Sequence, residues 1–378
     1  MKILVVAPCY HPAVSYGGPV VAIHRMNREL VSKGVDVAVY TTNANGPLDL
    51  DVPLDREVNV DGVVVRYFPV SKPRRYFYAP EMAAALKQNL HDFDCVHINW
   101  LYVYTTLVSA RLCIKMGVPY LLTPHGMLDT FSMKLKGYLR KKFYISFIEK
   151  KHLSHSQCIH YASVGEESES VIKGWDLPSI VVPNGVDIID LPIVSEDIYV
   201  KYPELANKKL VLSMGRLNYI KGLDMLLEAW PFVVARVEDA HLVIAGPDSE
   251  GYLDELVAIA RKGDVSESVT FTGMVVGGEK ATLLNSADVF VSSSKLESFG
   301  MAIVEAMSWA LPVVITDRVN IKSEIERGAA GLVTACDALK IAESIIYLLK
   351  NPKTSKTMGE NGRKLVINKF SIAAATDS

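Results

Sequence analysis

The sequence predicts an α/β protein built from two doubly wound domains. A chain of 378 residues is longer than most single domains, so two are expected. Short β-branched runs alternate with helix-like runs, and this alternation is typical of mostly parallel sheets covered by helices on both faces. The alternation stops between Asp187 and Lys208, in a charged stretch that contains proline, and then resumes. We therefore expect a linker there.

The first domain is expected over residues 1–190. Its strand-like runs are 3–7, 35–41, 63–68, 95–98, 120–123, 158–162 and 180–182. Its helix-like runs are 20–32, 80–91, 103–116, 135–153 and 166–173. A first strand followed by a glycine-rich turn and a helix also explains the apolar N-terminus better than a signal peptide does.

The second domain is expected over residues 191–360. Its strand-like runs are 210–214, 241–245, 269–272, 289–292, 313–316 and 331–334. Its helix-like runs are 223–237, 252–261, 279–286, 301–310, 338–350 and 355–370. Residues 361–378 are expected to form a C-terminal helix.

Composition excludes several classes of protein. The net charge of −2 gives no support for nucleic-acid binding, and no apolar run approaches the roughly 18 residues of a transmembrane helix. The five cysteines are odd in number and show no metal-ligand spacing, so reduced thiols in the cytoplasm are expected.

The most informative stretch joins a buried strand at 288–291 to a helix at 301–310. Ligands of parallel α/β sheets bind at such junctions, and the unpaired N–H groups of the helix attract phosphate. Glu297 lies in the loop, and Glu305 lies one turn into the helix, with its side chain leaning back toward the loop. Carboxylates accept hydrogen bonds from sugar hydroxyls, so the junction predicts a sugar-nucleotide site. An ordinary junction with two surface acids is the alternative.

Two further loops follow strands of the first domain. Gly17 and Gly18 would let the backbone approach a ligand after the first strand, although a plain tight turn explains them equally well. The pattern is not GxGxxG and no acid ends the second strand, which disfavours dinucleotide binding. His125 ends another strand, in the layer where ligands bind. His97 lies within an apolar strand and is expected to be structural.

A pair of cations follows the first strand of the second domain. Arg216 and Lys221 stand five residues apart in a turn bounded by Gly215 and Gly222. Two cations with close backbone access suit a diphosphate. We therefore expect a diphosphate site here.

Taken in order, these motifs resemble glycosyltransferase family 4, the retaining group 1 glycosyl transferases of GT-B architecture. That architecture has two Rossmann-like domains facing each other across a cleft. The most specific match is a Glu, seven residues and a second Glu, from Glu297 to Glu305. The glycine-flanked run with Arg216 and Lys221 matches as well, and so does the run 183–187.

The resemblance implies a role for each matched residue. Arg216 and Lys221 would hold the donor diphosphate, Glu305 the ribose hydroxyls, and Glu297 the donor sugar. His125 would lie at the reacting centre. Backbone groups would complete the donor site at Gly17, Gly18, Phe299, Gly300, Met301 and Ala302. The C-terminal helix would return to the first domain.

The resemblance also implies a front-face reaction, in which a phosphate oxygen of the departing nucleotide takes the acceptor proton. No metal or other cofactor is expected, because cations and a helix N-terminus stabilise the leaving group. Two DxD strings, 49–51 and 92–94, leave a metal-dependent transferase as a minor alternative.

The acceptor side is predicted from a basic, amphipathic stretch at 134–151, with seven Lys or Arg and one Glu interleaved with apolar residues. Such a helix can rest on an anionic membrane, although a core helix with a solvated basic face is equally consistent. Residues 72–78 form a second basic and aromatic stretch.

We therefore expect a metal-independent, retaining hexosyltransferase in the cytoplasm, at the inner face of the plasma membrane. Its donor would be a UDP-sugar such as UDP-glucose, and its acceptor a saccharide or lipid-linked saccharide of a surface polysaccharide or glycolipid. A sugar-nucleotide epimerase of the same architecture and a non-catalytic sugar-nucleotide-binding protein remain alternatives.

Overall fold

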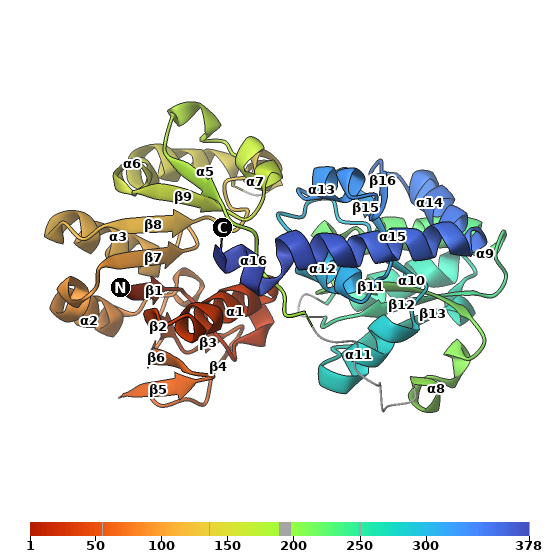
Figure 1. Cartoon of the computed structure of the whole chain (residues 1–378), viewed down its shortest axis with the longest axis horizontal. Coiled ribbons are helices and arrows are strands. Elements are labelled where there is room, and N and C mark those ends of the chain that lie inside the picture. Colours follow the sequence, from red (N-terminus) through yellow and green to blue (C-terminus); the bar gives the residue numbers. More distant parts are fainter. Residues whose placement is uncertain (55, 136, 189–197, 249–250, 378) are drawn as a thin grey trace. The chain divides into compact units, whose positions relative to one another are not determined.

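The computed structural model describes residues 1–54, 56–135, 137–188, 198–248 and 251–377. The chain divides into two compact units (Figure 1). Unit 1 comprises Met1–Gly185 and Ile372–Ser378, and unit 2 comprises Val186–Ser371. The boundary expected at residue 190 falls within 189–197, which lies outside the described residues.

Unit 1 is built on an eight-stranded sheet with the order β10-β9-β8-β7-β1-β2-β6-β5. The strands are β1 (Lys2–Val6), β2 (Asp36–Thr42), β5 (Glu57–Val60), β6 (Val63–Phe68), β7 (Cys95–Asn99), β8 (Tyr120–Thr123), β9 (Cys158–Tyr161) and β10 (Ser179–Val181). All neighbours pair in parallel except β5 and β6, which form an antiparallel hairpin. Two short strands, β3 (Ala44–Asn45) and β4 (Leu48–Asp49), pair separately. The sequence did not predict β5, an edge strand with no fully buried residue.

Helices cover both faces of this sheet. They are α1 (Gly18–Ser32), α2 (Pro80–Asn89), α3 (Tyr104–Met116), α4 (Thr130–Leu135), α5 (Tyr138–Tyr144), α6 (Lys150–His155), α7 (Val164–Ser168) and α16 (Ile372–Asp377). Short 3₁₀ turns lie at Val14–Tyr16, Arg74–Tyr76, Leu90–Asp92 and Lys173–Trp175. Side chains of α2 and α3 pack on one face, where Leu86, Ala110 and Ile98 are completely buried. On the other face α1 places Ile23 against Val5 and Val39.

Two expected helices of unit 1 differ from the structure. The helix expected at 135–153 begins only at Tyr138, because Gly137 before it has φ 67°, and a π-helical turn at Ile145–Glu149 interrupts it. The helix expected at 166–173 is α7, which starts earlier because the Ser163 hydroxyl accepts a hydrogen bond from Glu166 N–H at 3.0 Å. Capping by Ser163 therefore sets the start of α7.

Unit 2 contains a fully parallel six-stranded sheet with the order β13-β12-β11-β14-β15-β16. The strands are β11 (Lys209–Met214), β12 (Ala240–Ala245), β13 (Val269–Gly273), β14 (Val289–Ser292), β15 (Val313–Thr316) and β16 (Gly331–Thr334). The order reverses between β11 and β14, so the chain leaves these two strands in opposite directions. That reversal places two loops side by side at the carboxyl edge.

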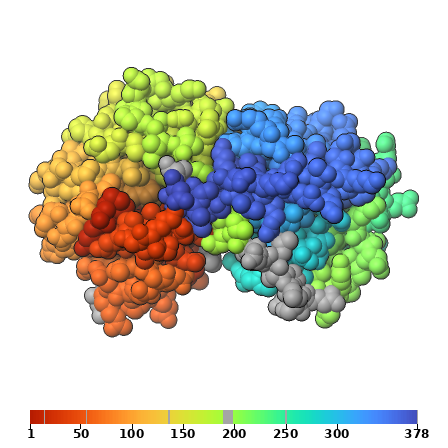
Figure 2. Space-filling view, viewed as in Figure 1, coloured from red at the N-terminus to blue at the C-terminus, as the bar shows by residue number. Residues whose placement is uncertain are grey.

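The helices of unit 2 are α8 (Ile198–Lys201), α9 (Leu223–Val234), α10 (Leu253–Lys262), α11 (Gly277–Ser286), α12 (Met301–Ser308), α13 (Lys322–Arg327), α14 (Ala338–Lys350) and α15 (Pro352–Leu365). Short turns lie at Pro203–Leu205, Tyr219–Lys221, Ser266–Ser268 and, as a π turn, Val366–Phe370. The core gathers α9 and α14 against the sheet, with Trp230 and Ile345 completely buried. Helix α15 lies at the surface, where its residues are blue in Figure 2.

The C-terminal helix expected over 361–378 is divided between the two units. Residues up to Ser371 belong to unit 2, and α16 belongs to unit 1. In unit 1 the ammonium of Lys33, the C-cap residue of α1, donates hydrogen bonds to Thr376 and Asp377 of α16. Among the described residues, no helix is long and apolar enough to cross a membrane.

Candidate active site

The loops after β11 and β14 meet at the switch point of unit 2. Gly222 has φ 61°, and a β-carbon there would lie 2.1 Å from the carbonyl oxygen of Ser293. Only glycine allows this approach. The Ser293 hydroxyl in turn donates to the carbonyl of Lys221 at 3.0 Å, and Asn218 accepts from Lys221 N–H at 3.2 Å. The Lys221 backbone is thus held from both sides.

Lys221 and Glu297 form an ion pair across the two loops. The ammonium of Lys221 donates to Oε2 of Glu297, with 28% and 17% of the two side chains exposed. The backbone of Glu297 is fixed independently, because its N–H donates to Arg318 at 3.1 Å and its carbonyl accepts from Asn320 at 2.9 Å. Two sequence-predicted residues therefore meet at one point, still reachable by a ligand.

The start of α12 follows directly. Gly300 caps the helix with φ 85°, and a β-carbon there would lie 2.6 Å from Ile303 and 3.2 Å from Glu297. The first N–H groups of α12, at Met301 and Ala302, precede the first intrahelical bond, which runs from Ile303 to Gly300 at 2.9 Å. The Phe299 side chain is buried and packs edge-on against Phe370. Phe299 therefore anchors the loop that leads into α12.

Glu305 has a partner that the sequence did not predict. The ammonium of Lys280 on α11 lies 2.6 Å from Oε2 of Glu305 on α12. The two residues are 25 positions apart, and the alternation pattern alone gives no signal that α11 and α12 meet.

A third lysine–acid pair borders the site. The ammonium of Lys295 lies 2.6 Å from Asp224 and 3.6 Å from the centre of the Tyr219 ring. Arg216 is half-buried in the loop after β11, and its side chain has no ion-pair partner within the described part of the chain. Arg216 is therefore the unneutralised cation of this group. A small cavity beside it is lined by Gly215, Lys221, Leu223, Ser292 and Ser294, among others.

In unit 1, His125 lies at the end of β8 with φ 49°. The amide nitrogen of Asn99 donates to backbone carbonyls, so its Oδ1 accepts from Nε2 of His125 at 2.9 Å. The proton of His125 therefore resides on Nε2. Burial, and secondarily the charge of His160, lowers the pKa of His125 to about 3. The ring is neutral at physiological pH and tilts against Trp100 at 4.8 Å.

A buried carboxylate holds the loop that carries His125. Glu166 is 2% exposed and accepts hydrogen bonds from Gly126 N–H and from Ala162 N–H, the latter at 2.8 Å. It thereby joins the loops after β8 and β9. Burial raises the pKa of Glu166 to about 7, against the lowering effect of these two backbone bonds.

The remaining predicted residues of unit 1 lie elsewhere on its sheet edge. Gly17, with φ 76°, caps α1, and Gly18 is the first residue of that helix. They follow β1, whereas His125 follows β8, and β7 separates the two strands. The structure thus brings Lys221 and Glu297 of unit 2 into contact beside the start of α12, while the predicted residues of unit 1 occupy two loops. His97, expected to be structural, hydrogen-bonds to Thr123 at 2.7 Å.

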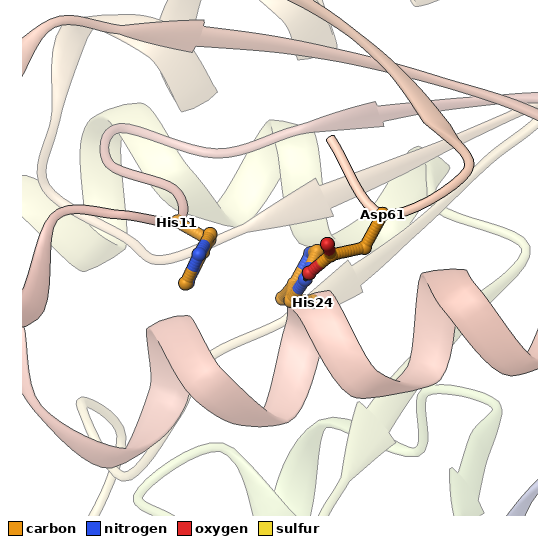
Figure 3. Close-up of side chains that lie close together, drawn as sticks. All are labelled: His11, His24 and Asp61. Atoms are coloured by element: carbon orange, nitrogen blue, oxygen red, sulfur yellow. The ribbon is translucent and has the colours of Figure 1, made fainter. Parts of the chain in front are cut away.

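One group of side chains could hold a metal by composition: His11, His24 and Asp61, with ligand atoms within 4.8 Å of one another (Figure 3). The two rings stack nearly parallel, at 10° and 4.5 Å between centroids. An imidazole binds a metal in its own plane, and two stacked planes share no such position. His24 instead bonds to Asp61 at 2.9 Å and Tyr10 at 3.0 Å. As arranged, the cluster is a hydrogen-bonded contact.

The DxD strings also have other partners. Asp49 forms an ion pair with Arg74, and Asp94 accepts from the backbone N–H of Lys2 at 2.7 Å. Both acids are therefore engaged in contacts within unit 1.

Known proteins resemble this chain over its whole length. The family model "Glycosyl transferases group 1" matches residues 194–365, and "Glycosyl transferase 4-like domain" matches residues 17–185. An uncharacterized glycosyltransferase of Methanocaldococcus jannaschii is 27% identical over 98% of this chain and 95% of its own. The α-monoglucosyldiacylglycerol synthase of Streptococcus pneumoniae is 24% identical over 83% of this chain and 70% of its own. The crystal structure of Anabaena HepE with UDP-glucose superposes with a TM-score of 0.79 at 19% identity, covering 100% and 97% of the chains.

Proposed function

Because the chain belongs to the group 1 glycosyltransferases of GT-B fold, we propose that it transfers a hexose, with retention, from a nucleotide-diphospho-sugar to a saccharide or lipid-linked saccharide. The proposal rests above all on the ion pair between Lys221 and Glu297, beside the start of α12. A cation, a carboxylate and a helix N-terminus meet there, and together they match phosphate and sugar hydroxyls.

In this proposal the donor diphosphate binds Arg216, Lys221 and the N–H groups at the start of α12. Arg216 supplies a charge that no acid of the described residues neutralises. Glu297 accepts hydrogen bonds from donor-sugar hydroxyls, and Glu305 accepts them from the ribose. Each glutamate already faces a lysine, so both are held in position before the donor arrives.

The reaction breaks the bond between the anomeric carbon and the diphosphate and forms a bond to the acceptor oxygen on the same face. The acceptor proton passes to a phosphate oxygen of the leaving nucleotide. Negative charge develops on that phosphate, and Arg216, Lys221 and the helix dipole stabilise it. Neutral His125 brings no net charge, and its unprotonated Nδ1 can accept one hydrogen bond from the substrate. We propose that these groups act without a metal ion.

The donor is proposed to be a UDP-sugar such as UDP-glucose. Support comes from the similarity of fold to HepE, whose crystal structure contains UDP-glucose. The relative from S. pneumoniae is named for a diacylglycerol product, which supports a lipid-linked acceptor.

We also propose a contact with an anionic membrane, at its inner face, through residues 134–151. Several large apolar side chains there are exposed, by 42% (Tyr138), 77% (Leu139), 61% (Phe143) and 73% (Phe147). Exposed cations surround them at Lys134, Arg140, Lys142, Lys150 and Lys151. Apolar area and positive charge together favour an anionic lipid surface.

The first experiment is a thermal-shift screen with UDP, GDP, ADP and their common sugars, with and without EDTA. A ligand at a hundred times its Kd stabilises by about 2.7 kcal/mol, which gives a readily measured shift. We expect UDP compounds to raise the midpoint equally in EDTA. Loss of the shift in EDTA would contradict the metal-free site, and a shift with another base would replace UDP. NMR of the product then tests retention, and conversion of the donor sugar without an acceptor would identify an epimerase.

A further inference from the structure

A cavity of about 210 Å³ opens in unit 1 between the end of α3 and the start of α6, away from the strand-end loops described above. It is lined by Arg111, Ile114, Phe147, Ile148, Lys151 and His152. Nothing in the proposed donor chemistry uses these residues.

The lining divides into a cationic and an apolar part. Arg111 and Lys151 are both exposed, and neither has an ion-pair partner among the residues that the structure describes. Ile114 and Ile148 are half-buried beside them, and the Phe147 ring is 73% exposed. An unneutralised pair of cations beside an apolar wall suits a ligand that carries both a phosphate and a hydrocarbon chain.

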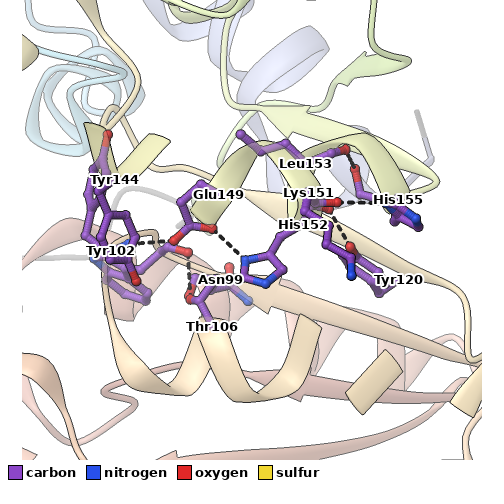
Figure 4. Close-up of polar contacts among 12 residues, drawn as sticks. Asn99, Tyr102, Thr106, Tyr120, Tyr144, Glu149, Lys151, His152, Leu153 and His155 are labelled. Carbon is purple, nitrogen blue, oxygen red and sulfur yellow. Dashed lines mark hydrogen bonds and ion pairs between the residues drawn. The ribbon is translucent and has the colours of Figure 1, made fainter. Parts of the chain in front are cut away.

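The floor of the cavity is fixed by a buried polar network (Figure 4). Nδ1 of His152 lies 3.1 Å from Oε2 of Glu149, and both side chains are at most 3% exposed. The other oxygen of Glu149 accepts from Tyr102 N–H at 3.3 Å, and the Tyr120 hydroxyl donates to the carbonyl of His152. Glu149 is thus engaged below the surface, and the exposed charged side chains that line the cavity, Arg111 and Lys151, are both cations.

The apolar wall continues outward as an exposed aromatic pair. The rings of Phe143 and Phe147 lie 4.4 Å apart, and Leu139 is exposed one turn before Phe143. Such side chains gain free energy when they enter the interface of a bilayer, whereas a free phosphate offers them no apolar surface. The surroundings therefore favour a lipid over other phosphate compounds.

We propose that this cavity binds the phosphate headgroup of an anionic phospholipid. Arg111 and Lys151 hold the phosphate, and the hydrocarbon chain follows Ile114, Ile148 and Phe147. The inference rests on the proposed membrane contact and adds to it a defined headgroup site. Such a site anchors the protein by one lipid at a time instead of by diffuse charge alone.

The test measures sedimentation with phosphatidylcholine vesicles that contain or lack phosphatidylglycerol. The variant Arg111→Ala/Lys151→Ala is compared with Arg236→Ala/Lys262→Ala, which also removes one exposed arginine and one exposed lysine, but from unit 2. Each cation near an anionic surface contributes about 1 kcal/mol to binding. The cavity variant loses two cations, so it should bind the vesicles about 30-fold more weakly. The control should change less than about twofold. Equal losses in both variants, or no loss in the cavity variant, would overturn the headgroup site.

A second arm separates lipid from free phosphate. Short-chain phosphatidic acid should displace the wild-type protein from vesicles, whereas inorganic phosphate at the same concentration should not. Equal displacement by both would reduce the cavity to a phosphate site and overturn the lipid assignment. Thermal shift with the donor is measured on all variants. An intact donor shift without any vesicle binding would reject the membrane contact and this site, and would leave the donor assignment standing.

Discussion

The ammonium of Lys280 lies 2.6 Å from the carboxylate of Glu305, and this pair joins α11 to the helix whose N-terminus faces the proposed diphosphate. Lys221 with Glu297 and Lys295 with Asp224 make two similar contacts nearby. Each acid is therefore oriented by a lysine from another segment of unit 2. This arrangement limits how far the proposed sugar-binding carboxylates can move before the donor binds.

Lys280→Ala should weaken donor binding by less than about tenfold and leave kcat nearly unchanged, because partly exposed ion pairs contribute about 1 kcal/mol or less. Lys280 acts only by positioning Glu305. Donor titration and steady-state kinetics measure the two effects separately. Lys340→Ala, which breaks the exposed pair with Glu343, is the matched control. A fall in kcat without a change in donor affinity would contradict this role.

Arg216→Ala and Lys221→Ala should each lower kcat by roughly 10²–10³, the usual cost of one preorganised group that stabilises developing charge. Lys209→Ala serves as the control. It removes a lysine paired with Asp239 at 3.2 Å, at the opposite end of β11. If kcat of either site variant fell by less than about threefold, the assignment of the diphosphate site would be contradicted.

Gly222→Ala should destabilise the protein much more than Gly273→Ala. Both glycines have a positive φ, 61° and 70°, but a β-carbon at Gly273 meets no atom within 4 Å, whereas at Gly222 it meets Ser293 at 2.1 Å. The backbone strain alone costs about 1 kcal/mol. Displacement of the Ser293 loop should add about 2 kcal/mol in urea unfolding of Gly222→Ala. Equal free energies of unfolding for Gly222→Ala and Gly273→Ala would show that the Ser293 loop moves without a loss of stability.

The fold was largely predictable from the sequence, because buried strands and amphipathic helices each require a regular spacing of apolar residues along the chain. Most strands lie within a residue or two of the expected ranges, whereas β5 was missed because an edge strand lacks a buried apolar run. The helix expected at 301–310 ends at Ser308. Ends of this kind depend on local capping and packing, which periodicity does not encode.

The candidate site was predictable only in part. Glu297, Lys221 and Gly222 occur in short runs with a recognisable spacing, and the structure brings them together. Lys280 and Glu166 could not be found in this way. Lys280 contacts Glu305 in unit 2, and Glu166 contacts Gly126 in unit 1, and each contact joins distant segments of the chain. Only the order of strands in the sheet determines which loops become neighbours.

The stability of unit 1 should depend on the protonation of Glu166. Its pKa rises from 4.5 in the unfolded chain to about 7 in the fold, so the folded state binds the proton more tightly. The associated stabilisation is complete below pH 4.5 and is lost as pH rises through 7, with a total near 3 kcal/mol. Glu166→Gln does not titrate at this position. Its free energy of unfolding, measured with denaturant, should lie below that of wild type at about pH 5, and the difference should shrink by about pH 8. A constant difference would contradict the raised pKa.

His125 should produce the opposite dependence. Its pKa falls from 6.5 to about 3 on folding, so its contribution to stability is complete above pH 6.5 and declines as pH falls toward 3. His125→Asn should therefore unfold less steeply with acid than wild type does. In the proposed reaction the ring stays neutral. The pH profile of kcat should therefore show no inflection near pH 6.5 that depends on His125, so wild type and His125→Asn should have the same profile shape there.

The two ends of unit 2 adjoin each other. The N–H of Val186 donates to the carbonyl of Phe370 at 2.9 Å, and a β-carbon on Gly185 would lie 2.5 Å from Ile372. Unit 2 is therefore inserted into unit 1, and α16 returns the chain to unit 1. A gene segment encoding 186–371 should yield an autonomously folding module. Unit 1 should then be restored by a short bridge from residue 185 to residue 372, whereas simple removal of residues 372–378 would deprive α1 of its covering helix.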